Sequence, residues 1–299
     1  MRSGDSRVPQ GVLEEQARPT PHGAALGTLA LRGISKTYGS GKRAVQALQE
    51  TSVDIRSGDF VSILGPSGCG KTTLLKIVGD IVSPSTGSVL IDERPNSEMR
   101  RARRIGYAFQ SPVLLPWRDV RSNVTLPFDV ARSGGRFKRI PDEIQSRVDE
   151  VLETVGLTAF ADRLPRELSG GMQSRVALAR ALVFEPSVLL MDEPFAALDE
   201  LTRTAMAIHL LSVWERIQTT VVFVTHHIQE AVLLSNRILV ISERPGRVRR
   251  DIAVDLPRPR SVATRRLPLF REITEDLVAD FYAQERDTQT AGESEAPDG

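Results

Sequence analysis

The sequence has little of several features that mark particular classes of protein. It contains one cysteine, Cys69, so an internal disulfide is excluded. No apolar run approaches the roughly 20 residues that cross a bilayer, and the N-terminal residues lack a charged, then apolar, then small-residue secretion pattern. We therefore expect a chain that stays in the cytosol unless a partner holds it at a membrane.

Net charge is also nearly absent. The 39 Lys and Arg residues face 38 Asp and Glu residues, which gives a formal charge of +1 at pH 7. No global positive field therefore indicates a nucleic-acid partner. Five arginines cluster between 94 and 104 without interleaved aromatic residues for base stacking, and we interpret them as a solvated helix face. With 299 residues, 40% of them hydrophobic, the chain can bury a substantial core.

A glycine-rich loop between a strand and a helix predicts a function most directly. Residues 60–64 have the pattern of a buried strand, and residues 74–78 that of a helix. Between them the pattern G-x-x-x-x-G-K-[ST] is matched by Gly65, Pro66, Ser67, Gly68, Cys69, Gly70, Lys71 and Thr72, followed by Thr73. Glycines let backbone N–H groups approach a phosphate chain, Lys71 supplies charge to the β- and γ-phosphates, and Thr72 offers a hydroxyl to Mg²⁺. The sequence therefore predicts a nucleoside triphosphate site.

Two further strand ends carry groups suited to hydrolysis. Residues 187–191 form a continuous apolar run, typical of a strand buried on both faces, and it ends in Asp192 and Glu193. Ligands of open α/β sheets bind at the carboxyl ends of strands. We therefore expect Asp192 to hold Mg²⁺ through water and Glu193 to accept a proton from, or orient, the attacking water. The strand at 220–224 delivers His226, which can reach a γ-phosphate.

Three other features carry weaker signals. Tyr38 precedes a glycine turn and could stack on a purine base, although a half-buried strand-end tyrosine is the ordinary alternative. Ser169, Gly170 and Gly171 can start a helix and expose N–H groups to an anion, as ordinary helix caps also do. Cys69 is either an alkylation-sensitive site or a structural filler.

The order of these motifs resembles the ATP-binding subunit of an ABC transporter over roughly residues 29–256. The resemblance rests on the phosphate loop, Gln110 at a strand end, the signature 168–173, Asp192 with Glu193, Asp199 of an Ala-Leu-Asp triplet, and His226. It implies an α/β fold, namely a P-loop NTPase core with a mainly parallel sheet, an antiparallel β subdomain and an inserted α-helical subdomain.

The resemblance also implies roles for these residues, with ATP and Mg²⁺ as ligands. Tyr38 would be the base-stacking aromatic, and Asp199 would belong to the nucleotide site. The resemblance implies Thr72, Gln110 and Asp192 at the metal, and Glu193, His226 and Gln110 in catalysis. The signature residues Ser169, Gly170 and Gly171 would complete the site of a partner subunit, which implies a head-to-tail homodimer.

Further segments resemble the importer branch for nitrate, sulfonates, taurine and related small molecules. They are Phe109-Gln110, residues 114–118, Asn123-Val124, Pro194-Phe195 and residues 244–247. The resemblance implies permease subunits that dock near Gln110–Arg118, an indirect solute-binding protein, no nucleic acid, and a peripheral place on the cytoplasmic face of the cell membrane. From the residues alone, the apolar cluster at 114–117 is either core or a docking patch, and Trp117 is our docking candidate.

Other functions remain as alternatives. A soluble ABC-type ATPase that acts on nucleic acid or ribosomes usually has two cassettes or a long coiled-coil insertion, whereas this chain shows one set of motifs and no extended heptads. The intact Asp192, Glu193 and His226 argue against an adaptor that binds nucleotide without turnover. A small-molecule kinase fits the phosphate loop alone.

The composition of the two ends and the resemblance of the part between them together predict four segments along the chain. They are a disordered tail over 1–27, an ABC ATPase domain over 28–256 with a helical subdomain at about 111–175, a C-terminal helical extension over 257–283, and a disordered tail over 284–299.

Overall fold

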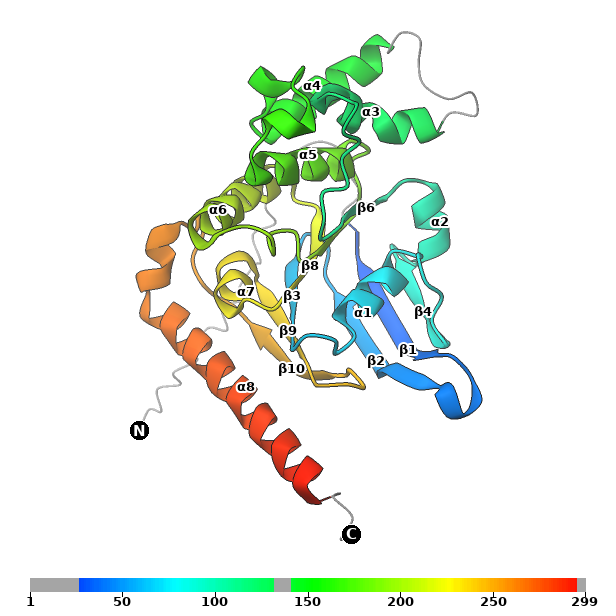
Figure 1. The fold of residues 1–299 in the computed structure, drawn as a ribbon, viewed down its shortest axis with the longest axis vertical. Coiled ribbons are helices and arrows are strands. Elements are labelled where there is room, and N and C mark those ends of the chain that lie inside the picture. The colour runs from blue at the N-terminus through cyan, green and yellow to red at the C-terminus, as the bar shows by residue number, and fades with distance from the viewer. Residues whose placement is uncertain (1–26, 132–140, 295–299) are drawn as a thin grey trace, which may run out of the picture.

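The larger of two sheets forms the centre of the computed structural model, which describes residues 27–131 and 141–294. Its six strands run in the order β10-β9-β3-β8-β7-β6 (Figure 1). They are β3 (Phe60–Leu64), β6 (Ile105–Ala108), β7 (Val188–Asp192), β8 (Thr220–Thr225), β9 (Arg237–Ile241) and β10 (Val248–Ala253). All neighbouring pairs are parallel except β10 with β9 at one edge.

The central strands of this sheet are buried on both faces. Alternate side chains of a strand point to opposite faces, so Phe223 packs into one core cluster while Val222 and Val224 pack into another. Because helices or the second sheet cover each face, no position in β3, β7 or β8 needs a solvent-facing side chain. The strands predicted at 60–64, 187–191 and 220–224 are therefore confirmed.

The smaller sheet is antiparallel and covers one face together with helix α1 (Lys71–Val78). Its order is β2-β1-β4-β5, formed by β1 (Leu29–Tyr38), β2 (Val45–Ile55), β4 (Thr86–Ile91) and β5 (Arg94–Pro95). Leu74, Leu75 and Ile77 of α1 pack between the two sheets. This helix is thus fixed with its first turn beside the carboxyl end of β3.

Helices cover the other face of the larger sheet. Those that pack on it are α5 (Gly170–Leu182), α6 (Glu200–Ile217), α7 (Ile228–Leu234) and α8 (Pro268–Ser294). Helices α3 (Val120–Ala131) and α4 (Asp142–Thr154) lie beyond α5 at one end of the molecule (Figure 1). Among the helices that the structure describes, none is both long and apolar enough to pass through a bilayer.

This architecture confirms the predicted fold class, with a mainly parallel core sheet, an antiparallel β subdomain and inserted helices. The C-terminal helix ends later than we predicted, because α8 continues to Ser294 and the tail predicted from 284 starts inside it. The predicted tail residues 1–26 and 295–299 lie outside the described part of the chain.

The arginine cluster at 94–104 does not form one solvated helix face. Two of the five residues lie in α2 (Asn96–Arg101). Arg104 donates from Nε to Ser187 Oγ at 2.9 Å, and the Arg103 guanidinium carbon lies 4.9 Å from the centre of the Phe184 ring. The interpretation as a solvated helix face is wrong for Arg103 and Arg104, which connect the start of β6 to the segment before β7.

Candidate functional site

The phosphate loop follows β3 and has a backbone that only glycine adopts easily. Gly68 and Gly70 have φ angles of 77° and 110°. A Cβ atom added to Gly70 would lie 2.7 Å from the Ala47 carbonyl oxygen, closer than real contacts allow. The loop therefore needs glycine at position 70 both for its conformation and for its packing against β2.

Lys71 is held inside this loop. Its side chain is 4% exposed, and Nζ donates to the carbonyl oxygens of Gly65 at 2.7 Å and Pro66 at 2.8 Å. The ammonium group thus lies within the loop at the first residue of α1, where helix N–H groups are unpaired. A buried positive charge among unpaired N–H groups fits the phosphates of a nucleotide.

A hydroxyl and a carboxylate meet beside the loop. Thr72 Oγ1 donates to Asp192 Oδ1 at 2.9 Å, so α1 and the end of β7 share this contact. Burial raises the pKa of the Asp192 carboxyl, and the hydrogen bond from Thr72 works against that shift. Two hard oxygen groups next to a phosphate site fit Mg²⁺, which prefers oxygen ligands and usually retains several waters.

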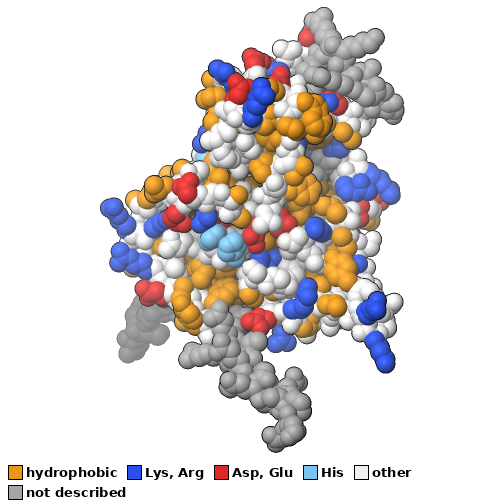
Figure 2. Space-filling view, in the orientation of Figure 1, with side chains coloured by type: hydrophobic (Ala, Val, Ile, Leu, Met, Phe, Trp, Pro, Cys, Tyr) orange, Lys and Arg blue, Asp and Glu red, His pale blue; other side chains and the backbone are white. Residues whose placement is uncertain are grey.

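Glu193 and His226 come together at neighbouring strand ends. Glu193 has a φ of 45°, and its N–H donates to the Val224 carbonyl oxygen at 3.0 Å. Its Oε2 lies 3.0 Å from Nδ1 of His226. A left-handed backbone at a non-glycine residue is strained, and such strain often marks a functional site. In Figure 2, histidine side chains reach the surface near the middle of the molecule, among acidic and basic side chains.

Tyr38 lies at the end of β1, beside the start of α1. Its hydroxyl is 3.5 Å from Thr73 Oγ1, Lys36 Nζ is 5.1 Å from the ring centre, and the residue is 41% exposed. The structure thus brings the ring to the phosphate loop, with part of its surface open for an aromatic base.

The remaining predicted residues lie at helix starts or in loops. Asp199 caps α6, where its Oδ1 accepts from the Thr202 N–H at 3.0 Å. Hydrogen bonds from the side chain and the backbone of Thr202 lower the pKa of the Asp199 carboxyl. Ser169 caps α5 by accepting from the Met172 N–H at 3.3 Å. Gln110 is exposed, two residues beyond β6 and therefore at the same edge of the sheet as Asp192.

The signature residues stand apart from the phosphate loop of their own chain. A Cβ added to Gly170 would lie 3.3 Å from Leu198 Cδ2, and one added to Gly171 would lie 3.2 Å from Thr202 Cγ2. The start of α5 therefore packs against the start of α6. Among the described residues, no hydrogen bond or ion pair joins Ser169–Gly171 to the loop 65–73.

Cys69 is a structural filler. The side chain is 1% exposed, and burial raises the pKa of its thiol, so little reactive thiolate is present at neutral pH. Of our two interpretations, the alkylation-sensitive site is thus disfavoured.

The predicted docking segment is only partly exposed, since Trp117 reaches the surface whereas Leu114 packs against the core. Trp117 is 73% exposed, and Val113 and Phe109 also reach the surface. Arg118 is instead mostly covered, with its side chain 13% exposed, and its guanidinium pairs with Asp129 Oδ2 at 2.6 Å. Trp117 therefore fits a docking patch, whereas the predicted docking segment must exclude Arg118.

Sequence reasoning missed one supporting residue of the loop. Gly246 accepts from the Gln49 N–H at 2.9 Å and donates to the Ala47 carbonyl oxygen at 3.1 Å. A Cβ added there would lie 2.1 Å from the Cys69 carbonyl oxygen. Gly246 entered our sequence analysis only within residues 244–247, a segment that resembles the importer branch, because a sequence does not show which distant backbone a glycine touches.

Comparisons with known proteins agree on the family. The model of the ABC transporter family matches residues 48–196. An ATP-binding protein of Brucella abortus is 46% identical, over 81% of this chain and 90% of that protein. An aliphatic sulfonates import ATP-binding protein of Bacillus cereus is 39% identical, over 85% of this chain and 96% of that protein.

Solved structures lead to the same family. A dimeric ATP-binding cassette in a post-hydrolysis state with ADP and Pi has a TM-score of 0.64 and 36% identity, over 76% of this chain and 98% of that one. A Clostridium perfringens cassette, part of an ABC transporter complex, has a TM-score of 0.65 and 31% identity, over 75% of this chain and 87% of that one. This chain therefore belongs to the ABC transporter family, as an ATP-binding subunit that binds ATP with Mg²⁺ and hydrolyses it.

Proposed function

We propose that this chain powers the import of aliphatic sulfonates as a head-to-tail homodimer with two composite ATP sites. The observation that carries the proposal is the division of the site. Lys71, the Thr72–Asp192 pair and the Glu193–His226 pair gather at one sheet edge, whereas Ser169–Gly171 packs against the start of α6. A second copy would supply the missing half.

Each group at the sheet edge suits one part of hydrolysis. The loop N–H groups and Lys71 bind the phosphates, while Thr72, Asp192 and Gln110 would hold Mg²⁺. When bound, the metal would supply neutralising charge to the phosphate oxygens. Glu193 accepts a proton from the attacking water or orients it, and His226 approaches the γ-phosphate from the neighbouring strand end. Tyr38 stacks on the base.

The exposed apolar residues around Trp117 suit a permease surface. An indole that is 73% exposed is unfavourable in water, and large aromatic side chains often dominate binding energy when a partner buries them. The relatives named as sulfonate import proteins favour this class of solute over nitrate and favour transport over a soluble ATPase. A solute-binding protein outside the membrane would deliver the sulfonate, and this chain would lie peripherally on the cytoplasmic face.

Reconstitution tests the proposal. The chain is purified with its permease and placed in lipid vesicles, and ATP-driven uptake of a labelled alkanesulfonate is compared with uptake of nitrate. We expect sulfonate uptake to need ATP and the binding protein. Uptake of nitrate without uptake of the sulfonate would contradict the assigned solute.

The variant Trp117→Ala tests the docking surface in the same vesicles. We expect it to lower uptake at least about tenfold, because a buried aromatic contact is lost, while the isolated subunit hydrolyses ATP at the wild-type rate. Tyr282→Ala is the control, since Tyr282 is also an aromatic residue, 63% exposed, but lies on α8. Equal uptake by both variants and the wild type would rule out docking through Trp117.

A further inference from the structure

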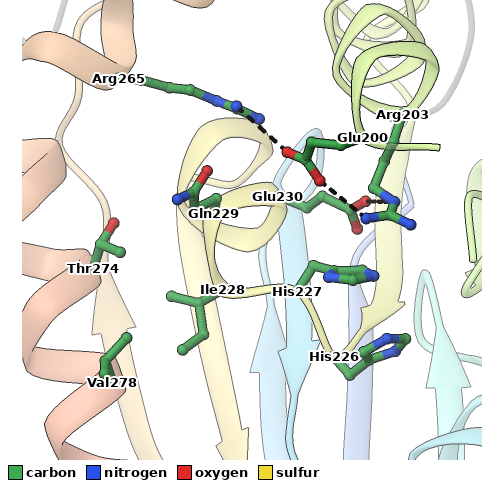
Figure 3. Close-up of a pocket in the computed structure, with 10 residues that line it drawn as sticks. All are labelled: Glu200, Arg203, His226, His227, Ile228, Gln229, Glu230, Arg265, Thr274 and Val278. Carbon is green, nitrogen blue, oxygen red and sulfur yellow. Dashed lines mark hydrogen bonds and ion pairs between the residues drawn. The ribbon is translucent and has the colours of Figure 1, made fainter.

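A buried polar cluster lies behind the two strand ends that carry Glu193 and His226. Its centre is Glu230 of α7, which is 4% exposed, and Arg203 of α6. Figure 3 shows these two side chains pointing toward one another from neighbouring helices, at the inner end of a pocket of about 410 Å³. None of the predicted roles uses either residue.

Glu230 fixes the turn that carries His226. Its Oε2 accepts from Thr225 Oγ1 at 2.7 Å, and the same hydroxyl oxygen accepts from the His227 N–H at 3.0 Å. The last residue of β8 and the residue before α7 are thus linked through the Thr225 hydroxyl, and the Glu230 carboxylate holds that hydroxyl in place. Because His226 is the residue between them, its backbone is held from both sides.

Arg203 fixes the loop that follows Glu193. Its Nη2 donates to the Leu198 carbonyl oxygen at 2.7 Å, one residue before Asp199. Its Nε lies 3.4 Å from Oε1 of Glu230, an oxygen that has no hydrogen bond among the described residues. The positive charge of Arg203 therefore offsets the cost of burying the negative charge on Oε1 of Glu230.

We propose that Glu230 and Arg203 are positioning residues that hold His226 at hydrogen-bond distance from Glu193. The Glu193–His226 contact is itself 3.0 Å long but partly open to water, because the two side chains are 19% and 41% exposed. Water competes with an exposed contact, whereas the Arg203 and Glu230 side chains are only 15% and 5% exposed, so water weakens their attraction less. The buried pair joins the two loops behind the catalytic contact. This inference rests on the roles proposed for Glu193 and His226.

The charge on Glu230 changes near neutral pH. Burial raises the pKa of its carboxyl to about 7, against the lowering effects of Thr225 and Arg203. The other titratable or charged groups around it are Glu193, Glu200, His226, His227 and Arg265, and the negative charges of Glu193 and Glu200 also raise the pKa of Glu230. Below this pKa the carboxyl is neutral and attracts Arg203 less, so the pair weakens as the pH falls.

Steady-state ATP hydrolysis of the full-length protein tests the proposal. Three variants are compared with the wild type, namely Glu230→Gln, Arg203→Met and the double variant, between about pH 6 and pH 9. We expect each single variant to lower kcat about tenfold to a hundredfold with KM for ATP changed less than about threefold, because the phosphate loop is untouched. The double variant should lose no more than the worse single variant, since both changes break one connection.

Two further readouts separate positioning from simple structural support. The fall of kcat caused by protonation of Glu230 should disappear in Glu230→Gln, leaving a flatter profile below about pH 7. Glu200→Gln is the matched control, because Glu200 contacts Arg203 Nη1 at 3.1 Å but is 65% exposed and lies outside the connection. It should keep the wild-type kcat.

Several results would overturn the proposal. They are a wild-type kcat and pH profile in Glu230→Gln, losses that multiply in the double variant, or a kcat that falls only in step with the fraction of folded protein. If Glu230→Gln does not fold, Thr225→Val removes the same connection by deleting one hydroxyl, and an unchanged kcat there overturns the proposal as well. None of these results would contradict the proposed function as long as the wild type hydrolyses ATP and Glu193→Gln does not.

Discussion

Glu193 combines a left-handed backbone conformation with a direct contact to a histidine side chain. Its φ of 45° turns the side chain out of the line of β7, and the carboxylate meets His226 Nδ1 at 3.0 Å. The sequence indicated Glu193 from its place after an apolar strand, but the backbone conformation and the contact with His226 depend on two strands far apart in the chain. The contact between Glu193 and His226 can therefore be recognised only in the folded structure.

The first prediction concerns Glu193→Gln. The amide keeps the shape of the side chain but cannot accept a proton, so kcat should fall by about a hundredfold or more while ATP still binds. Glu185→Gln is the control, because Glu185 also has a positive φ of 48° but is 61% exposed and pairs with Arg147. A phosphate-release assay together with nucleotide-binding measurements decides. Turnover within twofold of the wild type would remove Glu193 from the catalytic role.

The second prediction concerns the ion pair between Arg118 and Asp129. The two side chains are 13% and 8% exposed, so Arg118→Glu places two acids together in a buried site. We expect the free energy of unfolding to fall by about 3–5 kcal/mol, measured by urea denaturation. Arg163→Glu is the control, because Arg163 is 61% exposed and water screens its pairing with Glu167, so the stability should change much less. Equal stability of the two variants would contradict a buried role for Arg118.

At the scale of elements, the sequence was most informative where one segment forms a site by itself. The loop 65–73 contains its own glycines, charge and hydroxyl, so its strand-loop-helix form could be predicted from the pattern. The apolar runs at 187–191 and 220–224 are typical of strands buried on both faces, and both are confirmed. The arginines at 103 and 104 were misread, because their partners Phe184 and Ser187 are some 80 residues away.

The third prediction concerns the turn that follows β9. Gly246→Ala would place a Cβ atom 2.1 Å from the Cys69 carbonyl oxygen, so the phosphate loop must shift. We expect at least about tenfold weaker ATP binding, measured by titration calorimetry, because misplaced N–H groups lose contact with the phosphates. Gly41→Ala is the control for backbone strain alone, because Gly41 has a φ of 58° that disfavours alanine but nothing lies within 4 Å of the added Cβ. Wild-type affinity in Gly246→Ala would show that the turn does not support the loop.

At the scale of the whole molecule, the described residues contain both parts of the proposed composite ATP site but do not join them. Lys71, Asp192 and Glu193 lie at the edge of the larger sheet, and Ser169 caps a helix that packs against α6. The sequence could indicate both motifs through their resemblance to a family. It could not show that Gly170 and Gly171 face Leu198 and Thr202, because that contact arises only when α5 and α6 pack together.

Mixing two inactive variants is the most direct test of the composite site. Lys71→Ala damages the phosphate loop, and Ser169→Arg damages the signature, so neither variant alone should hydrolyse ATP appreciably. In a mixed dimer, the loop of one chain meets the intact signature of the other, which rebuilds one of two sites. We expect an equal mixture to recover up to about a quarter of the wild-type rate per chain, given random pairing. A mixture that stays at the background of the separate variants would contradict a site built from two chains.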